Sequence, residues 1–280
     1  MIEGRFGQLG GQHGGGMFWT LAIFGAVWAV FALALLRDLP EESSRVNAAE
    51  RELIAAGQEP DAGPGRSRVR WRPLLTNRNL WVVAGGYFAW GFMFWGFMYW
   101  LPSFLSDAYG LSVKQAGAFS VAPWACGMVG ALAGGVIVDR VYRRSPRVRS
   151  RFAVMGVALL LAGCSLVPLA ISPTLTVALI SISQGVGFGF VTGGIWWVAA
   201  IDAAPDQPGS AAGFADAAFA SSGIVAPSVM GFIVAGTGTF TSGFVVMACL
   251  AVAGALLMLL VPREPVPAAV TATETAGNPV

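Results

Sequence analysis

The feature that most constrains this chain is a series of seven long apolar stretches, each about 20 residues or longer. A helix needs roughly 17–25 apolar residues to cross the hydrocarbon core of a bilayer. Unbroken runs of this length also argue against a transmembrane barrel, whose strands show short alternating segments. We therefore predict seven membrane-spanning helices, at residues 17–36, 80–101, 116–138, 152–172, 175–201, 211–236 and 240–261.

The composition leads to the same class of protein. Charged residues make up 11% of the 280 residues and hydrophobic residues 55%, whereas about a quarter of a soluble domain is charged. A soluble chain of this length would need far more polar surface to stay in solution. We expect an all-α integral membrane protein.

The basic residues predict how the spans are oriented. Eight of the 17 Lys and Arg residues lie within residues 37–78, six lie within 140–151, and Arg263 follows the last span. If the spans alternate in direction, all three segments lie on one side, and basic loops mark the cytoplasmic side of a membrane protein. We therefore expect a multi-pass protein of the cell (inner) membrane, with residues 1–16 outside and a tail of residues 263–280 in the cytoplasm.

A polar linker, residues 37–79, separates the first span from the other six, whose connections are short. Within the linker, Asn47 and Glu50 have the spacing of a capping box, which predicts a short amphipathic helix at this point. The expected organisation is one transmembrane helix, a cytoplasmic linker, and a six-helix bundle of residues 80–262.

A glycine and a charged cluster follow the third predicted span, where the chain reads Gly-Val-Ile-Val-Asp-Arg-Val-Tyr-Arg-Arg from Gly135. We expect Gly135 to permit a close helix contact and Asp139 to end the helix at the water boundary. Arg140, Arg143 and Arg144 would pair with Asp139 or with lipid phosphate. The alternative is an ordinary basic loop on the cytoplasmic side. A six-helix unit with this motif, after a long cytoplasmic linker, resembles the carboxy-terminal half of the major facilitator superfamily.

Four passages further resemble the anion:cation symporter branch of that superfamily, which carries organic anions such as hexuronates, phthalates and tartrates. They are the start of the linker at 37–54, the lead-in to the second span at 71–81, Trp-Leu-Pro-Ser-Phe-Leu at 100–105, and the glycine-rich segment 213–231. The resemblance implies transport of a small organic anion, in symport with a proton or another cation.

The same resemblance implies that residues 17–36 are helix 6 of the family fold and that residues 80–262 are helices 7–12. Helices 1–5 would then be absent, and an amino-terminal half would have to come from a separate or missing segment. The alternative is a non-transporting membrane protein, or a fragment of a broken transporter gene.

Asp216 is the only acidic residue within any predicted span. A charged group is costly in hydrocarbon, so such residues normally face a cavity or a partner. Asp216 is therefore a candidate for cation coupling or substrate binding, and the resembling branch usually has Asn at this place and a further polar residue where this chain has Phe219. The alternative is a residue in the first turns of its helix that reaches the hydrated headgroups.

Two further sets of side chains are substrate-binding candidates. Tyr87, Trp90 and Phe94 form an aromatic face at helical spacing in the second span, and the fifth span carries Gln184 and Thr192 on one face. The alternative for the aromatic face is packing or lipid contact. For Gln184 it is a hydrogen bond to a neighbouring helix.

Several classes of enzyme and receptor lack the residues they need. A retinal Schiff base needs a buried lysine, and Lys114 is the only lysine and lies in a loop. Membrane-embedded hydrolases need histidine at depth, and the only histidine, His13, lies outside the predicted bundle. We expect a protein that is not an enzyme, binds no metal or cofactor and no nucleic acid, and has the bilayer and a small organic anion as its partners.

Overall fold

The computed structural model describes residues 6–36, 43, 46–57, 69–145, 147–171 and 174–262. The chain divides into two units, Met1–Ser67 and Arg68–Val280, which are treated separately below. The tail at 263–280 and much of the linker at 37–79 lie outside the described residues.

The described residues of the first unit form two helices, α1 (Phe6–Leu35) and α2 (Ala48–Gly57). The part of α1 that is apolar enough to cross a membrane is Phe18–Leu35, which confirms the first predicted span. The helix itself begins earlier, at Phe6, within the segment that we expected to precede the span. The predicted linker helix is present as α2, and the Asn47 side chain accepts a hydrogen bond from the Glu50 backbone N–H at 2.8 Å. That bond satisfies one of the free N–H groups of the first turn.

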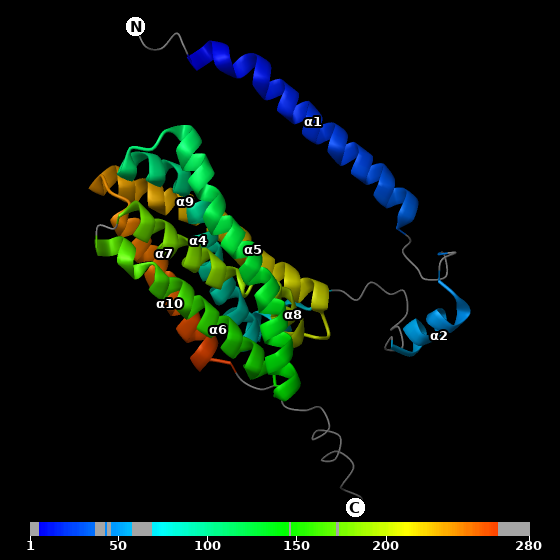
Figure 1. Ribbon diagram of the computed structural model, residues 1–280. Coiled ribbons are helices and arrows are strands. Elements are labelled where there is room, and N and C mark those ends of the chain that lie inside the picture. Colours follow the sequence, from blue (N-terminus) through cyan, green and yellow to red (C-terminus); the bar gives the residue numbers. More distant parts are fainter. Residues whose placement is uncertain are drawn as a thin grey trace, which may run out of the picture. The chain divides into compact units, whose positions relative to one another are not determined.

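The second unit is a helical bundle, coloured from cyan to red in Figure 1. All six of its predicted spans are confirmed as helices or helix pairs that are long and apolar enough to cross a membrane. The elements in chain order are α3 (Trp71–Thr76), α4 (Arg78–Tyr109), α5 (Val113–Arg144), α6 (Val148–Ser165), the 3₁₀-helix η2 (Val167–Ile171), α7 (Leu175–Phe190), α8 (Ile195–Ala203), α9 (Pro208–Thr237) and α10 (Thr241–Leu260).

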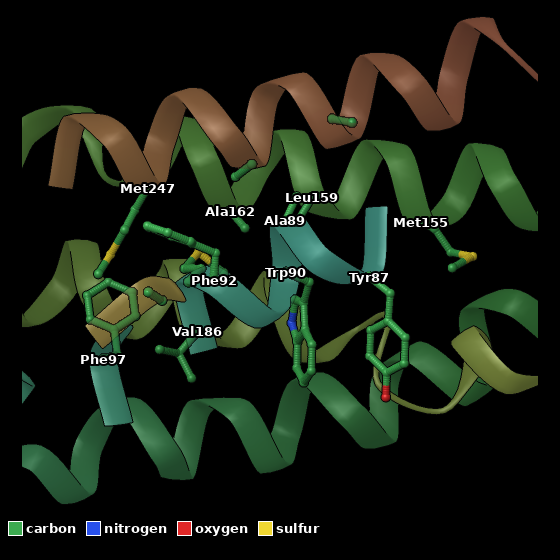
Figure 2. Close-up of a cluster of buried hydrophobic side chains, with 14 of the residues drawn as sticks. Tyr87, Ala89, Trp90, Phe92, Phe97, Met155, Leu159, Ala162, Val186 and Met247 are labelled. Atoms are coloured by element: carbon green, nitrogen blue, oxygen red, sulfur yellow. The ribbon is translucent and has the colours of Figure 1, made fainter. Parts of the chain in front are cut away.

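Helix α4 is the centre of the bundle. It packs along α9 and α10, while α5 packs on α7 and α6 packs on α10. Sixteen of its residues are buried, and they include Tyr87, Trp90 and Phe97. Figure 2 shows these side chains among the other buried apolar residues. The connections between the helices of this unit are only a few residues long.

The connection from α4 to α5 illustrates how the sequence makes such a turn. Gly110 ends α4 in the left-handed region at φ 65°, which glycine adopts without a steric penalty. Ser112 then begins α5, because its hydroxyl accepts from the Gln115 N–H while the Gln115 side chain accepts from the Ser112 N–H. The two helices therefore reverse direction within three residues.

Two predicted boundaries differ from the structure. We expected the second span to stop at Pro102, but α4 continues through this proline to Tyr109. Proline removes one helical hydrogen bond. Leu101, Phe104 and Leu105 on either side of it are nevertheless buried, so packing maintains the helix.

The fifth predicted span is two helices rather than one. Helix α7 ends at Phe190, and a turn that includes Gly193 and Gly194 leads into α8 at Ile195. Within this turn the Thr192 hydroxyl donates to the Gly189 carbonyl oxygen at 2.6 Å. Its side chain therefore satisfies backbone polarity where the helical ladder stops.

Candidate functional site

The described bundle brings Asp216 and Tyr87 together from two neighbouring helices. Tyr87 lies on α4 and is 3% exposed, whereas Asp216 lies on α9 and is exposed. The Tyr87 hydroxyl lies close enough to the Asp216 carboxylate for the two groups to interact electrostatically. Asp216 is eight residues from the start of α9, or about 12 Å along the helix axis at 1.5 Å per residue.

Phe219 follows Asp216 by one helical turn and lies over the aromatic face of α4. Its ring stacks on Tyr87 at 4.7 Å between centroids and on Trp90 at 5.2 Å. Gly91 makes this close approach feasible, since a Cβ at that position would lie 2.7 Å from the Phe219 ring. A residue larger than glycine at position 91 would therefore push the ring away from α4.

The aromatic contacts extend to both sides of Phe219. Tyr87 also stacks on Trp196 of α8 at 4.8 Å, with the two rings only 8° from parallel. On the other side Trp90 stacks on Phe94 at 5.3 Å. We call Tyr87, Trp90, Phe94, Trp196 and Phe219 the aromatic stack. Figure 2 shows Tyr87 and Trp90 pointing to the same side of α4.

Four of the six candidate binding residues therefore lie together: Asp216, Tyr87, Trp90 and Phe94. The other two lie elsewhere. Gln184 is exposed in an apolar groove between α5 and α7. Thr192 is fully buried, and its hydroxyl is used within the α7–α8 turn.

Two members of the stack, Phe219 and Trp196, were not identified as candidates from the sequence. Phe219 stood out only as a departure from a polar residue, and Trp196 gave no periodic signal because it follows the break between α7 and α8. The indole N–H groups of Trp196 and of Trp95, whose ring contacts Phe219, lack a hydrogen-bond partner among the described residues. No group of three or more His, Cys, Asp or Glu side chains that could hold a metal is found in the described part of the chain.

A second cluster of interest lies at the end of the bundle where α5 ends and α6 begins, which we call the arginine-rich end. Arg151 of α6 forms an ion pair with Asp202 of α8, and the two side chains are 17% and 25% exposed. The Arg151 guanidinium also lies over the ring of Tyr142 on α5, 3.9 Å from its centroid. Arg151 thus connects three helices.

The charged motif at the end of α5 shows no internal ion pair among the described residues. Asp139 forms no ion pair with Arg140, Arg143 or Arg144 within the described residues. The ion pair at this end of the bundle joins Arg151 and Asp202 instead. All four motif side chains are exposed. Exposed partners gain little from pairing in water.

The close helix contact predicted for Gly135 is not seen among the described residues and stays a prediction. A Cβ at Gly135 would have no neighbour within 4 Å. The close contact occurs instead at Gly130 and Gly134, where an added Cβ would collide with the Gly187 and Val191 carbonyl oxygens of the α7 side. Glycines at this spacing allow two helix backbones to approach each other.

The arginine-rich end also fastens the last part of the linker. The Gln207 side chain accepts from the Arg70 backbone N–H at 2.6 Å, and Asn77 donates to the Ala203 carbonyl oxygen at 2.5 Å. Asn77 also caps α4 by accepting from the Leu80 N–H. The segments around residues 70–78, 142–151 and 202–207 therefore meet at one end of the bundle, as the alternation of spans predicts.

Comparison with known proteins identifies the family. Residues 6–227 match the family model described as Major Facilitator Superfamily. The chain is 30% identical over 243 residues to a probable sulfoacetate transporter of Cupriavidus necator, a match that covers 85% of this chain and 56% of the relative. It is 32% identical over 268 residues to a hexuronate transporter of Bacillus subtilis, covering 94% of this chain and 61% of the relative. A probable L-galactonate transporter of Escherichia coli is 28% identical over 256 residues, which are 90% of this chain and 55% of the relative. The chain thus spans little more than half the length of these relatives, and on the match across residues 6–227 it belongs to the Major Facilitator Superfamily.

Proposed function

We propose that this chain is the carboxy-terminal part of a transporter for a small organic anion. The observation that carries the proposal is the similarity over 85% or more of the chain to relatives named for sulfoacetate, hexuronate and L-galactonate. These names have in common a compact solute with an acidic group. Such a solute needs a path through the bilayer that is lined with polar or charged groups.

The proposed path runs past the face that carries Asp216 and Tyr87. This face has the only acidic side chain that lies in the middle part of a described membrane-spanning helix. An exposed carboxylate within a transmembrane helix is stable when it faces water or a ligand rather than lipid. We place the substrate site on this face, with Trp90 and Phe94 as its apolar wall.

Two further parts of the proposal concern the whole transporter. The arginine-rich end is proposed to lie in the cytoplasm, as the positive-inside rule predicts. Transport is proposed to be coupled to a proton or another cation, and Asp216 is the group in this chain that would act on a cationic species. The opposing half of the path would come from an amino-terminal half equivalent to helices 1–5, because alternating access requires two halves that rock against each other.

The experiment is uptake of radiolabelled glucuronate, galactonate and sulfoacetate into proteoliposomes. One sample contains this chain alone, and a second contains this chain with the amino-terminal half of the Bacillus subtilis hexuronate transporter. The control contains both halves of that relative, produced separately. We expect no accumulation by this chain alone and accumulation by the hybrid pair.

Two outcomes would contradict the proposal. Accumulation by this chain alone would show that no second half is needed. If the relative's own separated halves transport and the hybrid accumulates none of the three acids, the function of a transporter half is wrong. A non-transporting membrane protein would then be the better description.

A further inference from the structure

The site around Asp216 has a charge that is unexpected in a pocket for an anion. Arg and Lys residues of the described bundle lie at or beyond the ends of its helices, and the middle parts contain none. Asp216 is in no ion pair with any described residue. An anionic solute on this face would therefore meet a negative side chain and no positive one.

The surroundings of Asp216 are aromatic rather than hydrogen-bonding. Phe219, one turn away, is partly exposed and stacks on the buried rings of Tyr87 and Trp90. The nearby Ser222 hydroxyl is already used, because it donates to the Phe219 carbonyl oxygen at 2.6 Å. The exposed charged group on this face is thus the Asp216 carboxylate, whereas the unpaired indole N–H of Trp95, whose ring contacts Phe219, is a buried atom.

This combination selects among possible cations. A metal ion such as Na⁺, Mg²⁺ or Ca²⁺ needs several oxygen ligands, and aromatic rings supply none. An organic ammonium group instead gains from both parts of the site, since it is attracted to the carboxylate and to the negative faces of aromatic rings.

We infer that Asp216 and the partly exposed ring of Phe219 bind the ammonium group of a substrate that carries both charges, a zwitterionic organic acid. This inference rests on the proposed function, which supplies the acidic end of the substrate. Phe219 lies one turn beyond Asp216 on α9 and stacks on Tyr87, so the ring and the carboxylate are presented on neighbouring turns of one helix. The acidic end of the substrate then lies away from Asp216, toward the opposing half of the path.

The test measures the binding of tetramethylammonium to the full chain in detergent micelles. Ligand-observed NMR detects the binding as broadening of the methyl resonance of the probe. Neopentyl alcohol serves as the neutral probe of similar shape and acetate as the anionic one. We expect tetramethylammonium to bind, and Asp216→Asn to weaken its binding about tenfold. Asp206→Asn, which removes an exposed carboxylate in the α8–α9 connection, should leave the affinity unchanged.

Phe219→Leu gives a second, independent variant, since it keeps an apolar side chain and removes the ring. It should weaken tetramethylammonium binding severalfold and leave neopentyl alcohol unaffected. Equal binding by wild type, Asp216→Asn and Phe219→Leu would overturn the inference, as would binding of neopentyl alcohol that matches the cation. Uptake of an organic acid by the hybrid pair without cation binding here would overturn this inference alone. Cation binding without uptake by the hybrid would support the inference and contradict the proposed function.

Discussion

At the scale of single residues, Arg151 is the side chain whose importance was hardest to foresee. In the sequence it is one of six arginines in a basic segment, and in the structure it holds α5, α6 and α8 together through Tyr142 and Asp202. Its role depends on Asp202, which lies 51 residues away and just beyond the predicted end of its span. Spacing along the chain carries no signal for such a pair.

Arg151→Ala should therefore destabilise the bundle by about 1–2 kcal/mol, because a partly buried carboxylate loses its partner. Thermal unfolding in detergent, monitored by circular dichroism, measures this loss. Arg144→Ala is the matched control, since Arg144 is exposed at the same end without an ion pair among the described residues. Adding Asp202→Asn to Arg151→Ala should cost little more, and a fully additive double variant would show that the two residues do not interact.

At the scale of helices, the sequence predicted which segments are helical but not which faces meet. Seven apolar runs were sufficient to place seven spans, because length and hydropathy are local properties. The sequence predicted a close helix approach at Gly135, whereas the described contact of α5 with the α7 backbone is made at Gly130 and Gly134. Asp216 and Tyr87 likewise lie close together only because α4 and α9 are adjacent. That adjacency follows from tertiary packing, which periodicity within one helix does not specify.

Two glycine substitutions on α5 test this assignment of the contact face. Gly130→Ala should lower stability by about 1–3 kcal/mol, because the added methyl group collides with the Gly187 backbone and forces α5 and α7 apart. Gly135→Ala places the same methyl group in open space and should leave stability unchanged or raise it by up to about 1 kcal/mol. The two melting temperatures give the comparison directly. A larger loss for Gly135→Ala than for Gly130→Ala would mean that the α5–α7 contact is misassigned.

At the scale of the whole molecule, the direction of the bundle in the membrane is a prediction from its arginines. Lys114 and Arg144 lie near opposite ends of α5, so single cysteines at these positions report the two sides. In intact cells, an impermeant maleimide should label Lys114→Cys and should label Arg144→Cys only after the cells are opened. The native cysteines Cys126, Cys164 and Cys249 are exposed and must first be replaced by alanine. Labelling of position 144 alone in intact cells would reverse the orientation.

The central claim is that the face with Asp216 and Tyr87 lines a water-filled path, and cysteine reactivity at two exposed positions within membrane-spanning helices tests it most directly. Asp216→Cys samples that face, while Leu256→Cys samples an exposed position in the apolar groove between α6 and α10. In the background without native cysteines, reconstituted in nanodiscs, the rates of reaction with a small charged thiosulfonate are compared. We predict that Asp216→Cys reacts at least about tenfold faster, because the reagent attacks thiolates, which form in water and not in hydrocarbon. Equal, slow reaction at both positions would contradict the claim and would place Asp216 against lipid.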